Sequence, residues 1–177
     1  MLRRDPFADP QQLIRRVYAY VAYRIGDGPD AEDVTSETLE RALRYRSSYD
    51  RSKGEPLAWL LGIARKCIAE AMAERPAPTD WVAETAAPGD LADDVARRID
   101  VAAAVRMLDE RDRELIALRY GSDLTAKQIA DLLGERTNTV EVALHRALRR
   151  LKTELEREPQ PLPAAATHPT DVRAVSS

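Results

Sequence analysis

The residues best suited to chemistry share the outward face of a helix that begins at Thr137. Helical spacing places Asn138, Val142, His145 and Arg149 on one stripe of this helix. An Asn amide can pair with an adenine edge and a Val side chain can contact a thymine methyl, whereas Glu141 would suit a cytosine amino group. The candidate DNA-reading residues are therefore Thr137, Asn138, Thr139, Glu141, Val142, His145, Arg146 and Arg149.

A helix-turn-helix over residues 124–151 would position that face. Two apolar stripes at helical spacing flank a turn: Ile129, Leu132 and Leu133, then Val140, Leu144, Leu148 and Leu151. Gly134 tolerates the left-handed conformation that ends the first helix, and Thr137 is expected as the N-cap of the second. Ala130 is small enough for the helices to cross closely. Two alternatives remain open: an ordinary helical hairpin, and basic residues that only complement the helix dipole.

A second candidate site is a charged stripe on a helix expected over residues 30–47. The stripe consists of Asp33, Glu37, Glu40, Arg41 and Arg44. The opposite, apolar face holds Val34, Leu39, Ala42 and Leu43. Such a stripe is usually a solvated helix face, and the alternative is a docking surface for a basic partner helix. The residues of this helix alone favour the solvated face.

A third candidate site combines an aromatic side chain with basic residues. A helix expected over residues 56–74 carries Trp59, Arg65 and Lys66, and the loop before it adds Arg51 and Lys53. An aromatic ring beside cations suits stacking on an unpaired base. The alternative is a Trp that belongs to the helix core.

Catalysis finds little support in the sequence. His145 and His168 are the only histidines, and we find neither a glycine-rich phosphate loop nor a Ser-His-Asp or Cys-His set. Cys67 has no second ligand at metal-binding spacing. We therefore expect no enzyme, no metal and no cofactor. The single cysteine excludes an internal disulfide and fits a reducing cytoplasm.

Composition predicts an all-α protein, because the 177 residues are rich in Ala, Leu, Arg and Glu. The net charge of −3 is unusual for a free-standing DNA binder, which must neutralise phosphates. Mild acidity therefore indicates weak autonomous DNA affinity or a protein partner. Neither a signal peptide nor an apolar run of membrane-spanning length is visible, so we expect a cytoplasmic protein without a membrane partner.

The Pro- and Gly-containing breaks between helical segments predict two small helical domains, each with a modest core. Residues 10–75 would form the first domain and residues 96–157 the second, joined by a Pro-rich flexible linker over residues 76–95. Trp81 in the linker is expected to anchor on a neighbouring surface. Residues 158–177 are Pro- and Ala-rich without a period, which predicts a disordered tail.

Three segments, in this order, resemble the extracytoplasmic-function (ECF) RNA polymerase sigma factors. DAEDVTSETLERALR, residues 30–44, is similar to the acidic segment of that family. PLAWLLGIARKCIAEAM, residues 56–72, resembles its Trp-containing helix, and residues 108–151 resemble its C-terminal domain. Each motif is moderately specific, whereas their order and spacing in so short a chain make the set strong.

The resemblance implies a bacterial sigma factor that binds core RNA polymerase and directs promoter-specific initiation. Asp33, Glu37, Glu40 and Arg41 would then bind a coiled coil of the largest subunit, which favours the docking interpretation of the stripe. The minus-ten element would be opened and held by Arg51, Lys53, Trp59, Arg65 and Lys66. The helix from Thr137 would read the minus-thirty-five element of promoter DNA. An anti-sigma protein is a further implied partner.

Several residues depart from the family pattern. Ser36 replaces a usual Gln and Lys66 a usual Asn, while Glu141 and Ala143 stand where positive charge is common. Fewer cations predict weaker or altered DNA contact. The alternative function is a sigma-like protein that binds polymerase or an anti-sigma partner with weak or altered DNA recognition. A conventional dimeric helix-turn-helix regulator is a third possibility.

Overall fold

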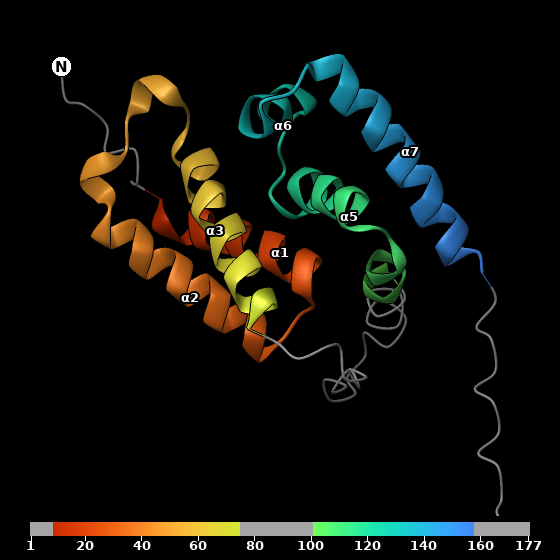
Figure 1. Ribbon diagram of the computed structural model, residues 1–177, viewed down its shortest axis with the longest axis horizontal. Coiled ribbons are helices and arrows are strands. Elements are labelled where there is room, and N and C mark those ends of the chain that lie inside the picture. Colours follow the sequence, from red (N-terminus) through yellow and green to blue (C-terminus); the bar gives the residue numbers. More distant parts are fainter. Residues whose placement is uncertain (1–8, 75–100, 158–177) are drawn as a thin grey trace, which may run out of the picture.

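The computed structural model describes residues 9–74 and 101–157, and both stretches are built from helices without a strand (Figure 1). The predicted linker over residues 76–95, the tail over residues 158–177 and Trp81 lie outside the described residues. Among the helices that are described, none combines the length and apolar character needed to cross a membrane. The all-α prediction is confirmed for these residues.

Three helices form the N-terminal part: α1 (Pro10–Ile25), α2 (Pro29–Arg44) and α3 (Pro56–Ala73). Each begins with a Pro, whose missing N–H is no loss in the first turn of a helix. The Asp9 side chain caps α1 by accepting a hydrogen bond from the Gln12 N–H at 3.0 Å. Two 3₁₀ turns, Arg46–Ser48 and Arg51–Lys53, connect α2 to α3. The second helix therefore ends earlier than the predicted residue 47.

The C-terminal part contains a helix over residues 101–107, followed by α5 (Glu110–Ile116) and a π-helical segment, η3 (Ala117–Gly121). The predicted helix-turn-helix is confirmed as α6 (Ala126–Leu133) and α7 (Thr137–Leu155). Gly134 ends α6 in the left-handed conformation, with φ of +70°.

The predicted N-cap at Thr137 is wrong. Thr137 is already the first residue of α7, and Arg136 occupies the cap position without a side-chain hydrogen bond. The capping function appears instead at α6, where Thr125 and Gln128 form a reciprocal capping box. Its polar pairing fixes the point at which the chain enters the helix-turn-helix.

Replacing Thr125 with Ala should lower the free energy of unfolding by about 1 kcal/mol, because the amide N–H of Gln128 loses its acceptor. Chemical denaturation followed by circular dichroism measures this change. Ser47→Ala, at an exposed position in the turn after α2, is the matched control and should leave stability unchanged. Equal stability of the Thr125 variant and the control would show that the capping box contributes nothing.

Two predicted apolar positions are exposed. In α7 the buried residues are Val140, Leu144 and Ala147, whereas Leu148 is 36% exposed. In α2 the buried face runs through Thr38 and Ala42, and Leu43 is 72% exposed. The reason is rotational. Leu43 and Leu148 directly follow the buried Ala42 and Ala147, and successive residues of a helix point about 100° apart.

The two expected cores are not separate, although a second, smaller cluster of Val105, Leu108, Ile116 and Ala147 lies in the C-terminal part. One cluster of buried residues runs from α1 and α3 into α5, η3 and the helix-turn-helix. Val17 and Tyr20 of α1 are fully buried in it together with Leu115 and Leu118 of the second domain. Figure 1 shows α1 and α3 facing α5 and α6, with α7 on the outer side. The two helical units therefore form one packed body.

A glycine makes this close approach possible. A Cβ on Gly121 would lie 3.0 Å from backbone atoms of Ala19 and Tyr20. Next to it, the Arg16 side chain donates through Nε to the Ser122 carbonyl at 2.8 Å, and the Ser122 hydroxyl donates to the Arg16 carbonyl at 3.0 Å. Backbone and side-chain contacts thus join α1 to the end of η3.

Candidate nucleic-acid and partner interfaces

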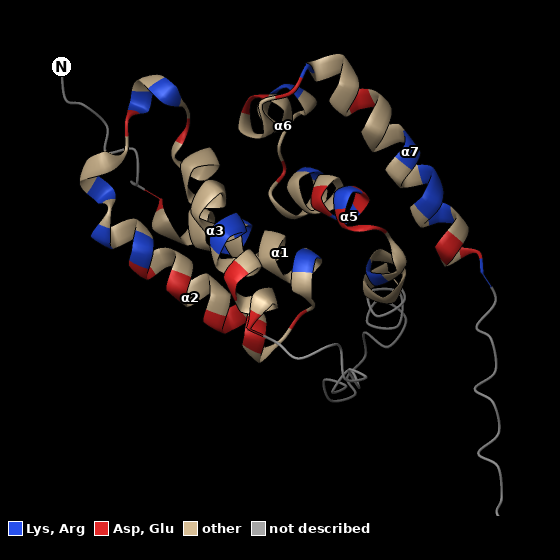
Figure 2. Ribbon diagram, in the orientation of Figure 1, with Lys and Arg blue, Asp and Glu red and all other residues tan. Residues whose placement is uncertain are grey.

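The acidic stripe on α2 divides into free and locally paired residues. Asp33 and Glu40 are exposed and make no hydrogen bond or ion pair with another described residue. Arg41 instead pairs with Glu37 at 2.5 Å and with Glu70 of α3 at 2.6 Å. The hydrogen bond from Arg41 lowers the pKa of Glu70. Asp33 and Glu40 are therefore the residues of the predicted set that are available to a partner. Figure 2 shows the acidic segments along α2.

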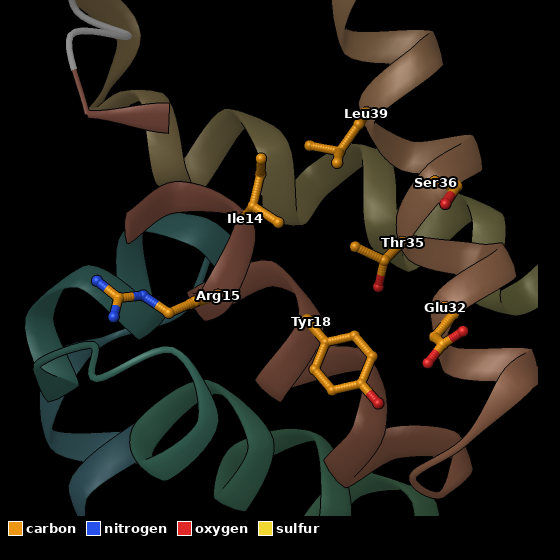
Figure 3. A pocket seen from close by; sticks show the side chains of 7 residues that line it. All are labelled: Ile14, Arg15, Tyr18, Glu32, Thr35, Ser36 and Leu39. Carbon is orange, nitrogen blue, oxygen red and sulfur yellow. The ribbon is translucent and has the colours of Figure 1, made fainter. Parts of the chain in front are cut away.

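A shallow pocket lies between α1 and α2 beside this stripe (Figure 3). Its lining consists of Ile14, Arg15, Tyr18, Glu32, Thr35, Ser36 and Leu39. The Thr35 hydroxyl is buried and has no hydrogen-bond partner among the described residues. Ser36, the departure from the usual Gln, belongs to this lining. In the described part of the chain, no group of three His, Cys, Asp or Glu side chains is placed to hold a metal.

The predicted aromatic-basic site gains a second aromatic ring. Trp59 in the first turn of α3 is half-buried, and its ring lies against that of Tyr49, with centroids 5.5 Å apart and an angle of 57° between the planes. Arg51 and Lys53 are exposed on the loop that precedes α3, and Lys66 is exposed further along the helix. Sequence reasoning missed Tyr49, although an aromatic residue at the edge of a basic loop was a usable signal.

Arg65 lies at the contact between the two domains. Its Nε is 3.1 Å from Oε1 of Glu114, a residue of α5. The Tyr20 hydroxyl donates to the same carboxylate at 3.0 Å, and Arg24 also pairs with it. Burial raises the pKa of Tyr20 to about 12, so its hydroxyl stays a donor at neutral pH.

Glu114 was not singled out by sequence reasoning. Its side chain is only 7% exposed, and it stands directly before the fully buried Leu115 and Ile116. A carboxylate is seldom buried without partners, so its position within an apolar run was the available signal.

The outward face of α7 is exposed as predicted. Asn138, Thr139, Glu141, His145, Arg146 and Arg149 are all exposed, Val142 is 44% exposed, and Thr137 is half-buried. Arg150, in contrast, pairs with Asp112 of α5, and that hydrogen bond raises the pKa of Arg150. Figure 2 shows Lys and Arg segments toward the C-terminal half of α7 and an acidic segment nearer its start.

The sequence matches two family patterns, Sigma-70 region 2 over residues 11–75 and Sigma-70 region 4 over residues 98–151. It is 32% identical over 150 residues to the ECF RNA polymerase sigma factor SigK of Mycobacterium ulcerans (strain Agy99), covering 80% of each chain. This chain belongs to the ECF RNA polymerase sigma factors. The ECF sigma factor SigD of Mycobacterium tuberculosis (strain ATCC 25618 / H37Rv) is 33% identical over 155 residues, covering 78% of this chain and 71% of SigD.

Other relatives are more distant from this ECF sigma factor. BldN of Streptomyces coelicolor (strain ATCC BAA-471 / A3(2) / M145) is 29% identical, and the match spans only 54% of its length. Among solved structures, the sigma factor RpoE in complex with the anti-sigma factor NepR from Bartonella quintana aligns with a TM-score of 0.68 at 22% identity, covering 86% of this chain and 97% of RpoE. CnrH, solved with the cytosolic domain of CnrY, aligns with a TM-score of 0.58 at 23% identity, covering 84% and 82%. These structures share its fold.

Proposed function

We propose that this ECF sigma factor binds core RNA polymerase and directs promoter-specific transcription initiation. The observation that carries the proposal is the combination, in one chain, of the region 2 and region 4 patterns with two exposed and differently charged surfaces. Asp33 and Glu40 on α2 offer negative charge to a basic partner, and α7 offers polar side chains to a DNA groove.

We assign the acidic residues of α2 to polymerase binding, and the basic and aromatic residues around the start of α3 to the minus-ten strand. Asp33 and Glu40 contact polymerase directly. Arg41 holds α2 against α3 through Glu70, Glu37 pairs with Arg41 within α2, and both residues border that contact. The basic loop with Arg51 and Lys53 follows the minus-ten strand, and Lys66 adds a phosphate contact. Trp59, supported by Tyr49, provides a ring on which an extruded base can stack.

The upstream element is read by the exposed face of α7. Asn138 and Val142 contact base edges, and Arg146 and Arg149 contact phosphates. Because Glu141 is exposed on the same face, binding by α7 alone is weak, and attachment to polymerase supplies the missing affinity. This division explains how a chain with a net charge of −3 functions on DNA.

An anti-sigma protein is the further partner that we propose. RpoE and CnrH were both solved in complexes, the first with an anti-sigma factor. The second candidate function, a sigma-like protein with weak or altered DNA recognition, is favoured by one observation, the acidic Glu141 on the DNA-reading face.

Run-off transcription with cognate core enzyme tests the proposal. Promoter fragments are first selected from genomic DNA by binding to the reconstituted holoenzyme, and core enzyme alone serves as the control. We expect discrete transcripts that depend on the added chain. Core binding without promoter opening would select the second function, and absence of both would exclude a sigma factor.

A further inference from the structure

The buried contact between the domains has the composition of an anion-binding site. The site, called the socket below, consists of Tyr20 and Arg24 of α1 and Arg65 of α3. All three direct their polar groups at the carboxylate of Glu114, which comes from the other domain. Two guanidinium groups and a phenol hydroxyl all donate to this one carboxylate.

The socket depends on the second domain for its negative charge. Both carboxylates that pair with Arg24, Glu114 and the more exposed Glu110, belong to α5. The Arg24 side chain is 8% exposed, and its Nε is buried without a hydrogen-bond partner among the described residues. Separation of the domains would leave two arginines without these counterions, and an arginine that loses its partner attracts another anion.

The position of the socket identifies the anion. Arg65 is 42% exposed at the edge of the contact, one residue before the exposed Lys66 in α3, the helix that also carries Trp59. Lys66 and Trp59 belong to the surface that we assign to the minus-ten strand, so a phosphate of that strand lies within reach of the same helix. The fork of a guanidinium matches phosphate as well as carboxylate, and a phenol hydroxyl can donate to either.

We propose that Tyr20, Arg24 and Arg65 form a phosphate-binding socket that Glu114 fills in the closed chain and a backbone phosphate of the promoter strand fills in the open chain. Closure and binding of the single strand therefore exclude each other. Glu114 acts as an internal mimic of the DNA backbone and restrains the free chain from engaging DNA. This inference rests on the proposed function, because it takes the promoter strand as the ligand.

Two variants release the contact by different routes. Glu114→Gln keeps the shape of the side chain but removes the charge that faces Arg24 and Arg65. Gly121→Ala changes no side chain of the socket, but it places a Cβ against the backbone of Ala19 and Tyr20 and so pushes the domains apart. Glu135→Gln is the matched control, because Glu135 pairs with Arg111 inside the second domain and has no part in the socket.

The first measurement concerns the conformation of the full chain without DNA. Spin labels are attached at Ser47→Cys and Lys152→Cys in a Cys67→Ala background, since Cys67 is the only native cysteine. Double electron–electron resonance should give one narrow distance distribution for the chain without further substitution and for the Glu135→Gln control. Both releasing variants should show a second, broader population of distances. A broad distance distribution in the chain without releasing substitutions would overturn closure.

The second measurement concerns DNA. A fluorescent single-stranded 20-nucleotide probe of mixed sequence is titrated with each variant. Glu114→Gln and Gly121→Ala should bind about tenfold more tightly than the unmutated chain, because an uncompensated buried charge shifts the equilibrium toward the open state. Adding Arg65→Gln to Glu114→Gln should cancel this gain and reduce the salt dependence of binding by about one phosphate contact.

The outcomes separate this inference from the proposed function. Opening without any gain in affinity would overturn the phosphate-binding role of the socket, and so would a gain that survives Arg65→Gln. Selective binding of an acidic peptide instead of DNA by the opened variants would also overturn it. Each of these results leaves the run-off transcription test of sigma activity unaffected.

Discussion

Reversing the charge of both Asp33 and Glu40 to Arg should weaken binding to core RNA polymerase by at least about tenfold, because opposite charges would become like charges across the contact. Both side chains are exposed and make no hydrogen bond or ion pair with another described residue, so their replacement removes no contact within the fold. Surface plasmon resonance on immobilised core enzyme at two salt concentrations measures the loss. The effect should be larger at low salt, where charges are screened less.

Amide variants of the same two residues separate the loss of negative charge from its reversal. Asp33→Asn with Glu40→Gln removes the charge without reversing it and should give an intermediate loss. Glu37→Lys is a poor substitute, because it also breaks the pair within α2 between Glu37 and Arg41, the residue that joins α2 to Glu70 of α3. Unchanged affinity of the double reversal, with an unchanged circular dichroism spectrum, would show that polymerase binds elsewhere on the chain.

Replacing Glu141 with Lys should strengthen binding to duplex DNA and steepen its salt dependence. If the new cation neutralises one phosphate, the slope of log K against log salt becomes steeper by about 0.9. Fluorescence anisotropy with a mixed-sequence duplex measures both quantities on the full chain, since the outward face of α7 is exposed in the closed structure.

Glu156→Lys provides the control for net charge. It makes the same change of two charges, but it lies at the end of α7, beyond the turns that face a groove. This control should raise affinity less and leave the slope nearer that of the unmutated chain. Identical behaviour of the two variants would show that Glu141 does not face DNA and that only net charge matters.

Local patterns in the sequence were sufficient to predict where the helices lie and that two of them form a helix-turn-helix. The expected helices over residues 30–47 and 56–74 lie close to α2 and α3, and Gly134 marked the turn of the helix-turn-helix in the conformation observed. These predictions succeeded because helical periodicity and left-handed caps depend on residues within a few positions of one another. The cap at Thr137 failed for a related reason: a favourable residue type does not fix the position at which the helix begins.

Among the candidate sites, the sequence identified which residues carry charge but not which of them are available. Asp33 and Glu40 of the acidic stripe are free, whereas Arg41 pairs with Glu70 from a neighbouring helix. Arg150 is similarly paired with Asp112, although its neighbour Arg149 is exposed. Pairing across helices depends on how they pack, and helical periodicity carries no information about the partner face.

The sequence by itself determined an all-α chain with a DNA-reading helix-turn-helix and an acidic helix, because these features follow from local spacing and residue type. Only the tertiary structure decided that the two halves share one core, with Glu114 placed against Tyr20 at a separation of 94 residues. The physical reason is that a buried carboxylate is stable only where donors converge on it. Those donors come from helices that only the folded chain brings together.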